Sequence, residues 1–215
     1  GQLLKSFSIF QDALKINPNH HLSNFNLGDL YARFNEIEKA TNCFKKTINF
    51  KPDFNLAYST YLFFINYSDK YDSNFYYKEA LGYSKSIKRF DKNLLIPFKY
   101  NKSVTKLKVG FVSSDLKNHP IGYFLFETLK YLKDMNIELV AYSNLIEKDE
   151  DSLTNELKNF FFQWHRTKNM NDLELINLIR DDKINLLIDL SGHSAKSRLP
   201  IFINRPAPLQ ITWAG

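Results

Sequence analysis

The sequence has a single cysteine, Cys43, in 215 residues. No intrachain disulfide can therefore form, and no cysteine-based zinc site can be built. One cysteine agrees with a reducing compartment, so we expect a cytoplasmic location. The chain has no run of about 18 uncharged apolar residues, so no membrane-spanning helix and no membrane partner are predicted. Neither GxGxxG nor GxxxxGK[ST] occurs, so neither dinucleotide binding nor a P-loop is supported.

Apolar and aromatic residues are abundant. Hydrophobic residues make up 44% of the chain, with 19 Phe and 12 Tyr, enough for a packed core. The net charge of +6 is uneven: residues 1–106 carry 16 Lys and Arg against 9 Asp and Glu, and residues 107–215 carry 13 against 14. The lysines of the first half are scattered at helical spacing, which indicates solvated helix faces. We therefore expect no nucleic-acid partner.

The first half contains a repeat. Pro18 and Pro52 lie 34 residues apart, and "FQDALKINPN" aligns with "FKKTINFKPD" at that offset. This period is typical of the tetratricopeptide (TPR) repeat, a pair of antiparallel helices. One complete unit spans about residues 21–53. Its signature positions hold Leu27, Gly28, Tyr31, Ala40, Phe44 and Pro52.

Two residues of this unit depart from the repeat pattern, since Asn24 stands where Trp is common and Thr47 where Ala is common. Residues 2–16 read as the second helix of a preceding repeat, and residues 54–66 begin a further one. The amphipathic stretch Tyr76–Phe90 lacks the repeat signature and is predicted to cap the array. The sequence thus predicts a helical-repeat domain over residues 1–90.

Residues 91–106 show no clear period and are predicted to be a linker, after which short β-rich runs alternate with amphipathic helices. Strands are predicted at Leu107–Val112, Ile137–Ser143, Phe161–Thr167, Ile184–Ser191 and Leu209–Gly215, and helices at Ile121–Asp134, Glu150–Phe160, Met170–Asp182 and Arg198–Asn204. This alternation predicts a parallel sheet with helices on both faces in a second domain, residues 107–215.

Parallel sheets of this kind bind ligands beyond the carboxyl ends of their strands. Three loops leave such ends, at 113–120, 143–149 and 191–197. The first contains His119 and the third contains His193, and both loops can open onto one edge of the sheet. Two histidines near one cleft form a candidate acid/base site. The alternative is that Asp115 and Asn118 only cap and turn the chain.

Several motifs resemble a known family. "LKVGFVSSDLKNHPIGYFL", "ELVAYSN" and "INLLIDLSGHSAKSRLPIFINRPAPLQITWAG", preceded by TPR units, are similar to the TPR-containing O-linked N-acetylglucosamine transferases, including their bacterial and SPINDLY-type members. The resemblance implies an α plus α/β chain: TPR repeats followed by the Rossmann-like amino-terminal lobe of a two-lobed GT-B glycosyltransferase. The carboxy-terminal lobe would follow residue 215, so this piece is expected to be inactive alone.

The resemblance also implies a reaction. The family moves N-acetylglucosamine from UDP-N-acetylglucosamine to Ser or Thr hydroxyls of proteins, with inversion and without a metal or another cofactor. The TPR groove presents the acceptor polypeptide. Two alternatives stay open: a relative that uses another nucleotide sugar, such as an O-fucosylating SPINDLY type, and a non-catalytic TPR scaffold.

By the same resemblance, residues of two loops belong to the site. His119 matches a histidine beside the sugar and the acceptor, with a role as base or as positioning group. The residues implied in substrate binding are Asn118, Pro120, Gly192, His193 and Ser194. The final "WAG" departs from the family's usual "WLG".

Overall fold

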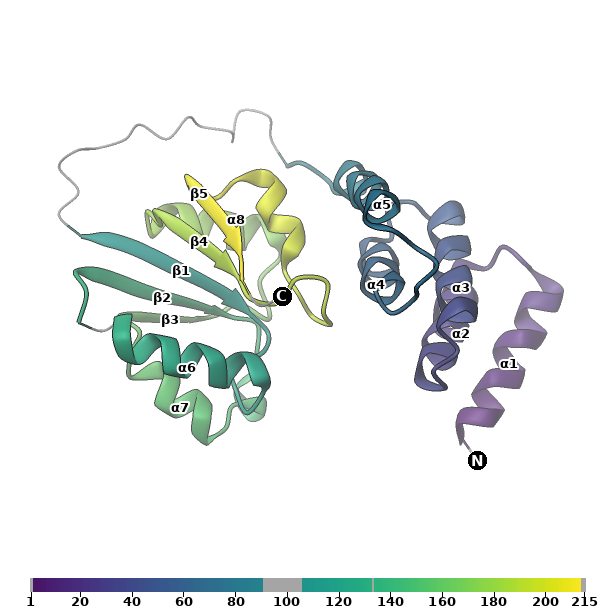
Figure 1. Ribbon diagram of the computed structural model, residues 1–215, viewed down its shortest axis with the longest axis horizontal. Coiled ribbons are helices and arrows are strands. Elements are labelled where there is room, and N and C mark those ends of the chain that lie inside the picture. The colour runs from purple at the N-terminus through teal and green to yellow at the C-terminus, as the bar shows by residue number, and fades with distance from the viewer. Residues whose placement is uncertain (1, 91–105, 133, 214–215) are drawn as a thin grey trace. The chain divides into compact units, whose positions relative to one another are not determined.

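The structure, a computed structural model, describes residues 2–90, 106–132 and 134–213 (Figure 1). The chain divides into two compact units between Lys88 and Arg89. The predicted linker, 91–106, lies outside the described residues except for Lys106. Within the described ranges, no helix is long and apolar enough to cross a membrane.

The first unit is built from helices alone. They are α1 (Gln2–Ile16), α2 (His21–Arg33), α3 (Ile37–Phe50), α4 (Asn55–Ile65) and α5 (Ser73–Ser86). The last helix begins earlier than its predicted start at Tyr76, because the Asp72 side chain caps it by accepting a hydrogen bond from the backbone N–H of Phe75 at 2.7 Å. It also ends at Ser86 rather than at Phe90.

The complete repeat packs as the signature residues predict. A Cβ atom on Gly28 would lie 2.7 Å from the fully buried ring of Phe44, so only glycine allows α2 and α3 to approach this closely. The two departures from the repeat pattern have a structural reason. Asn24 is buried and donates to the carbonyl oxygens of Pro18 and His20, at 3.0 and 3.1 Å. Thr47 is buried and donates to a carbonyl oxygen of its own helix at 2.9 Å.

The second unit alternates strands and helices. Its strands are β1 (Leu107–Ser113), β2 (Ile137–Ser143), β3 (Gln163–Arg166), β4 (Leu186–Asp189) and β5 (Leu209–Thr212); its helices are α6 (Pro120–Leu132), α7 (Ser152–Lys158) and α8 (Asp172–Asp181), with short 3₁₀ helices η2 (Glu147–Asp149) and η3 (Leu199–Asn204). All strands run parallel in the order β3-β2-β1-β4-β5, so β1 lies in the middle.

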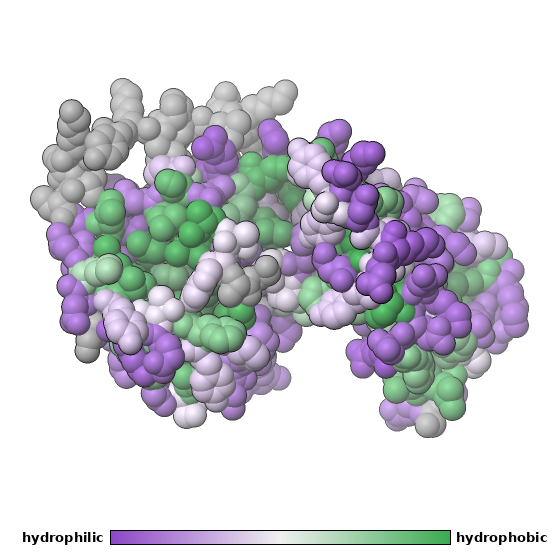
Figure 2. All heavy atoms as spheres, in the orientation of Figure 1, coloured by the Kyte–Doolittle hydropathy of each residue, from purple (hydrophilic) through white to green (hydrophobic). Residues whose placement is uncertain are grey.

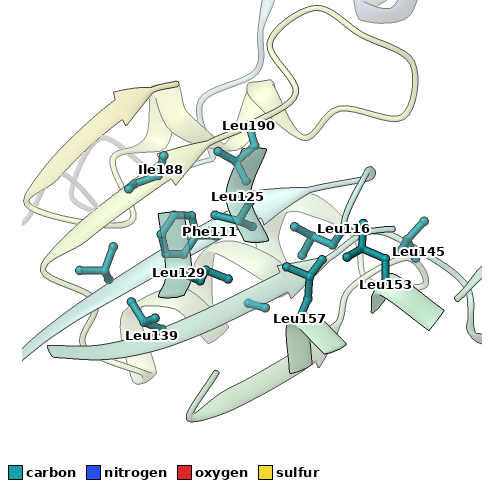
Figure 3. Packing of buried hydrophobic residues seen from close by; sticks show 12 residues of the cluster. Phe111, Leu116, Leu125, Leu129, Leu139, Leu145, Leu153, Leu157, Ile188 and Leu190 are labelled. Carbon is teal, nitrogen blue, oxygen red and sulfur yellow. The ribbon is translucent and has the colours of Figure 1, made fainter. Parts of the chain in front are cut away.

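Both faces of this sheet are covered, as side-chain alternation along each strand requires. Phe111 lies on the face that packs against α6 and α7, where Leu125 and Leu157 are fully buried (Figure 3). Val112 lies on the opposite face, which packs against α8 and η3. The predicted fold class, helical repeats followed by a Rossmann-like parallel α/β unit, is therefore confirmed.

The internal strand β4 differs from the expectation, and the edge strand β5 exposes apolar side chains. The strand predicted over Ile184–Ser191 is shorter and spans Leu186–Asp189. It ends at Asp189 because the Asp189 carboxylate accepts the backbone N–H of Ser191 and turns the chain. Apolar side chains gather over the strands of this unit in Figure 2, with hydrophilic ones around them. On the edge strand β5, Leu209 and Ile211 are exposed.

Candidate functional site at the carboxyl edge of the sheet

The loops after β1, β2 and β4 meet at one edge of the sheet. Ser113 at the end of β1 pairs in register with Ser143 at the end of β2, and Val112 pairs with Asp189 at the end of β4. The loops of β1 and β4 are joined by Ser191, whose hydroxyl accepts the backbone N–H of Ser114 at 3.3 Å. The expectation that these loops open onto one edge is confirmed.

His119 lies at the junction between the β1 loop and α6. Its side chain is half-buried, and its Nδ1 accepts the backbone N–H of Ile121 at 3.3 Å. Pro120 follows as the first helical residue, where a missing N–H has no cost. A backbone N–H can only donate, so the neutral His119 ring carries its proton on Nε2. His119 thus caps the helix with one ring nitrogen and offers a donor with the other.

Asn118 is exposed, yet its backbone is firmly held. Its N–H donates to the Asp151 carboxylate at 2.7 Å, and its side-chain oxygen accepts from the Tyr123 hydroxyl at 3.1 Å. Asp151 also caps α7 by accepting the N–H of Thr154 at 3.0 Å. Burial opposes ionisation of Asp151, but the N–H groups of Thr154 and Asn118 outweigh it and lower its pKa. One carboxylate therefore ties the His119 loop to the start of a helix.

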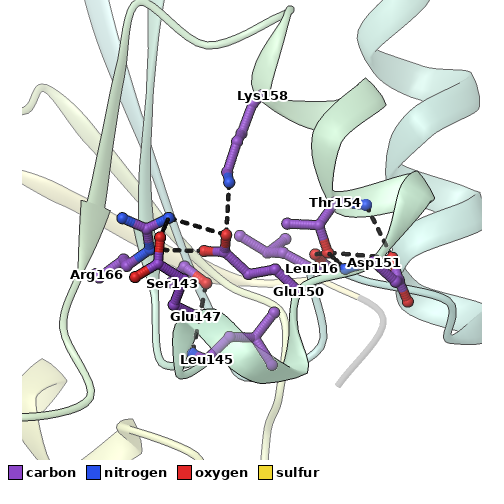
Figure 4. A network of polar contacts seen from close by, with 9 residues as sticks. All are labelled: Leu116, Ser143, Leu145, Glu147, Glu150, Asp151, Thr154, Lys158 and Arg166. Atoms are coloured by element: carbon purple, nitrogen blue, oxygen red, sulfur yellow. Dashed lines mark hydrogen bonds and ion pairs between the residues drawn. The ribbon is translucent and has the colours of Figure 1, made fainter.

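The segment before this cap is braced by an ion-pair network (Figure 4). The Glu150 carboxylate accepts from Arg166 at 2.8 Å and from Lys158 at 2.6 Å, and its side chain is only 7% exposed. Hydrogen bonding to Arg166 lowers the pKa of Glu150 and is the largest influence on it. Burial opposes this effect, and the hydrogen bond to Lys158 lowers the pKa further. Arg166 also pairs with Glu147 in η2 at 3.1 Å. The network fixes the β2–α7 connection that ends at Asp151.

The β4 loop is organised by the buried carboxylate of Asp189. Its oxygens accept the N–H groups of Ser191 and Gly192, at 3.2 and 2.9 Å, and the Thr212 hydroxyl at 3.3 Å. Burial raises the pKa of Asp189, and these three hydrogen bonds oppose the rise. Gly192 has a φ of 52°, a left-handed conformation that glycine adopts without strain.

His193 and Ser194 follow Gly192 in this loop, and both are half-buried. Burial lowers the pKa of His193 to about 4, so its ring is neutral at pH 7. A neutral imidazole can donate and accept hydrogen bonds without carrying a charge. Among the described residues, no group of three or more His, Cys, Asp or Glu side chains lies close enough to hold a metal.

Reasoning from the sequence missed three residues that shape this edge: Asn144, Asp151 and Asp189. Asp151 had a readable signal, because Asp followed by Thr three residues later, just before a helical pattern, resembles a capping box. Asn144 had none, since its side chain contacts a loop 52 positions away. Asp189 bonds the N–H groups of Ser191 and Gly192, two and three residues along the chain, but it was read only as part of the strand.

Comparison with known proteins places these residues in a family. The profile of glycosyl transferase family 41 matches residues 84–215. A protein from Petunia hybrida described as a probable UDP-N-acetylglucosamine–peptide N-acetylglucosaminyltransferase SPINDLY is 32% identical over 114 residues, which are 51% of this chain and 12% of that protein. A UDP-N-acetylglucosamine–peptide N-acetylglucosaminyltransferase from Caenorhabditis elegans is 30% identical over 118 residues, 51% of this chain and 10% of that protein.

A solved structure extends the similarity to the helical repeats. It is a mutant O-GlcNAc transferase from Thermobaculum terrenum, with a TM-score of 0.84 and 29% sequence identity. The match covers 97% of this chain and 40% of that chain. Because the family profile covers more than half of the sequence, this chain belongs to glycosyl transferase family 41.

Proposed function

We propose that this chain is part of a protein O-GlcNAc transferase, which transfers N-acetylglucosamine from UDP-N-acetylglucosamine to Ser or Thr hydroxyls with inversion. The observation that carries the proposal is the meeting of the His119 loop and the Gly192 loop at the carboxyl edge of the sheet, in a chain of glycosyl transferase family 41. The relatives with this printed activity are far longer, since the matched part is 12% of the Petunia protein.

In this proposal, the two loops line the space shared by the donor sugar and the acceptor. Gly192, His193 and Ser194 contact the sugar, and Asn118 and Pro120 shape the rim beside His119. The Nε2–H of His119 donates a hydrogen bond to a substrate oxygen and orients it for attack. A role as general base would require the proton to move to Nδ1, which would break the bond to the Ile121 N–H. His119 therefore acts as a positioning donor at the reacting atoms.

The remaining parts of the proposal concern partners and location. The helical repeats present the acceptor polypeptide, the reaction uses no metal or other cofactor, and the protein is cytoplasmic. Residues 1–215 alone are inactive, because the groups that stabilise the departing diphosphate lie elsewhere in the enzyme. Stabilisation of developing charge usually contributes more to catalysis than any other single effect, so loop residues alone cannot replace it.

The test is a donor panel. The full-length protein is incubated with an acceptor peptide and with UDP-N-acetylglucosamine, other UDP-sugars or GDP-sugars, and the peptide mass is measured. We expect an increase of one N-acetylhexosamine with the first donor only. Transfer of a deoxyhexose from GDP-fucose would replace the proposed donor, and no transfer from any donor would indicate a non-catalytic scaffold. Transfer by residues 1–215 alone would contradict the inactivity of this piece.

A further inference from the structure

Asn144 reaches from the β2 loop across the end of β1 to the β4 loop. Its backbone N–H donates to the carbonyl oxygen of Ser113 at 2.8 Å, which fixes its own position. Its side-chain Nδ2 donates to the carbonyl oxygen of Lys196 at 2.7 Å. The side chain is buried, with the residue 5% exposed. The buried side chain of Asn144 thus links two loops of the candidate site by a hydrogen bond.

The carbonyl that it holds belongs to an unusual backbone. Lys196 has a φ of 64°, in the left-handed region, where a side chain with a Cβ atom is disfavoured. Lys196 is exposed, so its own side chain does not pack to compensate. Residues in such conformations persist only where surrounding contacts impose them, and they cluster at ligand sites. The backbone at Lys196 therefore needs an external anchor.

Two side chains are close enough to serve as anchors. Besides Asn144, the Ser114 hydroxyl lies 3.1 Å from the carbonyl oxygen of Ala195. That hydroxyl is also 3.0 Å from a carboxylate oxygen of Asp115, and it has one proton to donate. Among the described residues, the Asn144 Nδ2 bonds no acceptor other than the Lys196 carbonyl oxygen. The Asn144 amide is consequently the dedicated anchor of this backbone.

The other half of the Asn144 amide offsets what the bond to Lys196 contributes to stability. Its Oδ1 is buried and has no hydrogen-bond partner among the described residues. A buried acceptor without a partner opposes folding about as much as a single buried hydrogen bond favours it. We propose that Asn144 is a positioning residue, which holds residues 192–196 in the conformation that receives the donor sugar. The inference rests on the proposed function of that loop.

The first test is the donor dependence of transfer by full-length Asn144→Ala. We expect the KM for UDP-N-acetylglucosamine to rise about fivefold, within the roughly 2- to 13-fold that one net hydrogen bond represents. The kcat should change less than twofold, because saturating donor selects the molecules whose loop is in place. An unchanged KM would overturn the proposal.

Asn204→Ala is the matched control. Asn204 is also a buried asparagine of the α/β unit, 3% exposed, at the end of η3. Its Oδ1 accepts the backbone N–H of Phe90 at 2.9 Å, and its Nδ2 has no partner among the described residues. Both substitutions thus remove one side-chain-to-backbone bond and one unpartnered atom. We expect similar melting temperatures but no KM change in Asn204→Ala; an equal KM rise would show that the effect is general destabilisation.

A rescue variant tests the backbone argument itself. Lys196→Gly, introduced into Asn144→Ala, removes the Cβ atom that disfavours the left-handed conformation. The double variant should recover most of the lost donor affinity, with a KM within about twofold of wild type. A double variant as weak as Asn144→Ala alone would overturn the proposal.

A readout without activity separates this inference from the proposed function. Trypsin cleavage after Lys196, followed by mass spectrometry of the full-length protein, should be faster in Asn144→Ala than in wild type or Asn204→Ala. If wild type transfers no sugar, the proposed function fails, and the cleavage rates still decide whether Asn144 anchors the loop. Equal cleavage in all three proteins would overturn the anchoring.

Discussion

His119 has two separable roles, and two substitutions distinguish them. Its Nδ1 caps α6 through the Ile121 N–H, and its Nε2 is the proposed donor to the substrate. His119→Asn keeps an oxygen suited to the cap, since asparagine is among the best N-cap residues, but it loses the Nε2 donor. His119→Ala loses both. Only His119→Ala should therefore destabilise the protein, and both variants should lose turnover.

The magnitudes follow from general values for the two interactions. Loss of an N-cap costs about 0.5–2 kcal/mol, so His119→Ala should melt a few degrees below His119→Asn. Loss of a single hydrogen-bond donor aimed at the reacting atoms costs about 10²–10³ in kcat, and we expect this loss in both variants. The assays are thermal unfolding and single-turnover sugar transfer in the full-length protein. Near-wild-type turnover of His119→Asn would refute the role of His119 toward the substrate. Equal melting temperatures of the two variants would refute the claim that Nδ1 of His119 caps α6, and with it the assignment of the ring proton to Nε2.

Three further predictions follow from the described contacts. Asp151→Ala should lower stability by about 1–2 kcal/mol and reduce transfer, because it removes a helix cap and frees the backbone of Asn118; unchanged melting and turnover would contradict this. Burial lowers the pKa of His193 from its ordinary value of 6.5 to about 4, so the unfolded chain takes up a proton at a higher pH than the folded protein. The free energy of unfolding should therefore fall as pH falls from about 6.5 toward 4. In denaturant titrations, the free energy of unfolding of His193→Gln should fall by about 1–2 kcal/mol less between pH 7 and pH 5 than that of wild type. An equal fall in both proteins would count against the buried neutral ring. Gly28→Ala should destabilise the helical unit by about 1–3 kcal/mol in the same titrations, because its Cβ would lie 2.7 Å from Phe44; a neutral effect would mean that the helices separate easily.

Much of the architecture could be predicted from local patterns. The 34-residue spacing of Pro18 and Pro52 indicated helical pairs, and the strand–helix alternation after residue 106 indicated a parallel sheet. Element ends were less certain. Helix α5 begins earlier than predicted and strand β4 ends earlier than predicted. In each case one aspartate side chain, Asp72 or Asp189, accepts a hydrogen bond from a nearby backbone N–H. Such bonds depend on a single polar atom, which hydrophobic periodicity does not register.

The sequence by itself determined the fold class, the family and the two loops that carry His119 and Gly192, because these depend on residue order and on periodic burial. Only the three-dimensional structure decided which ring nitrogen of His119 accepts the Ile121 N–H and which side chains hold the loops. Asn144 and Lys196 are 52 positions apart, and no local pattern pairs them. They meet because strand order places β2 and β4 on either side of β1, so their loops converge over its carboxyl end.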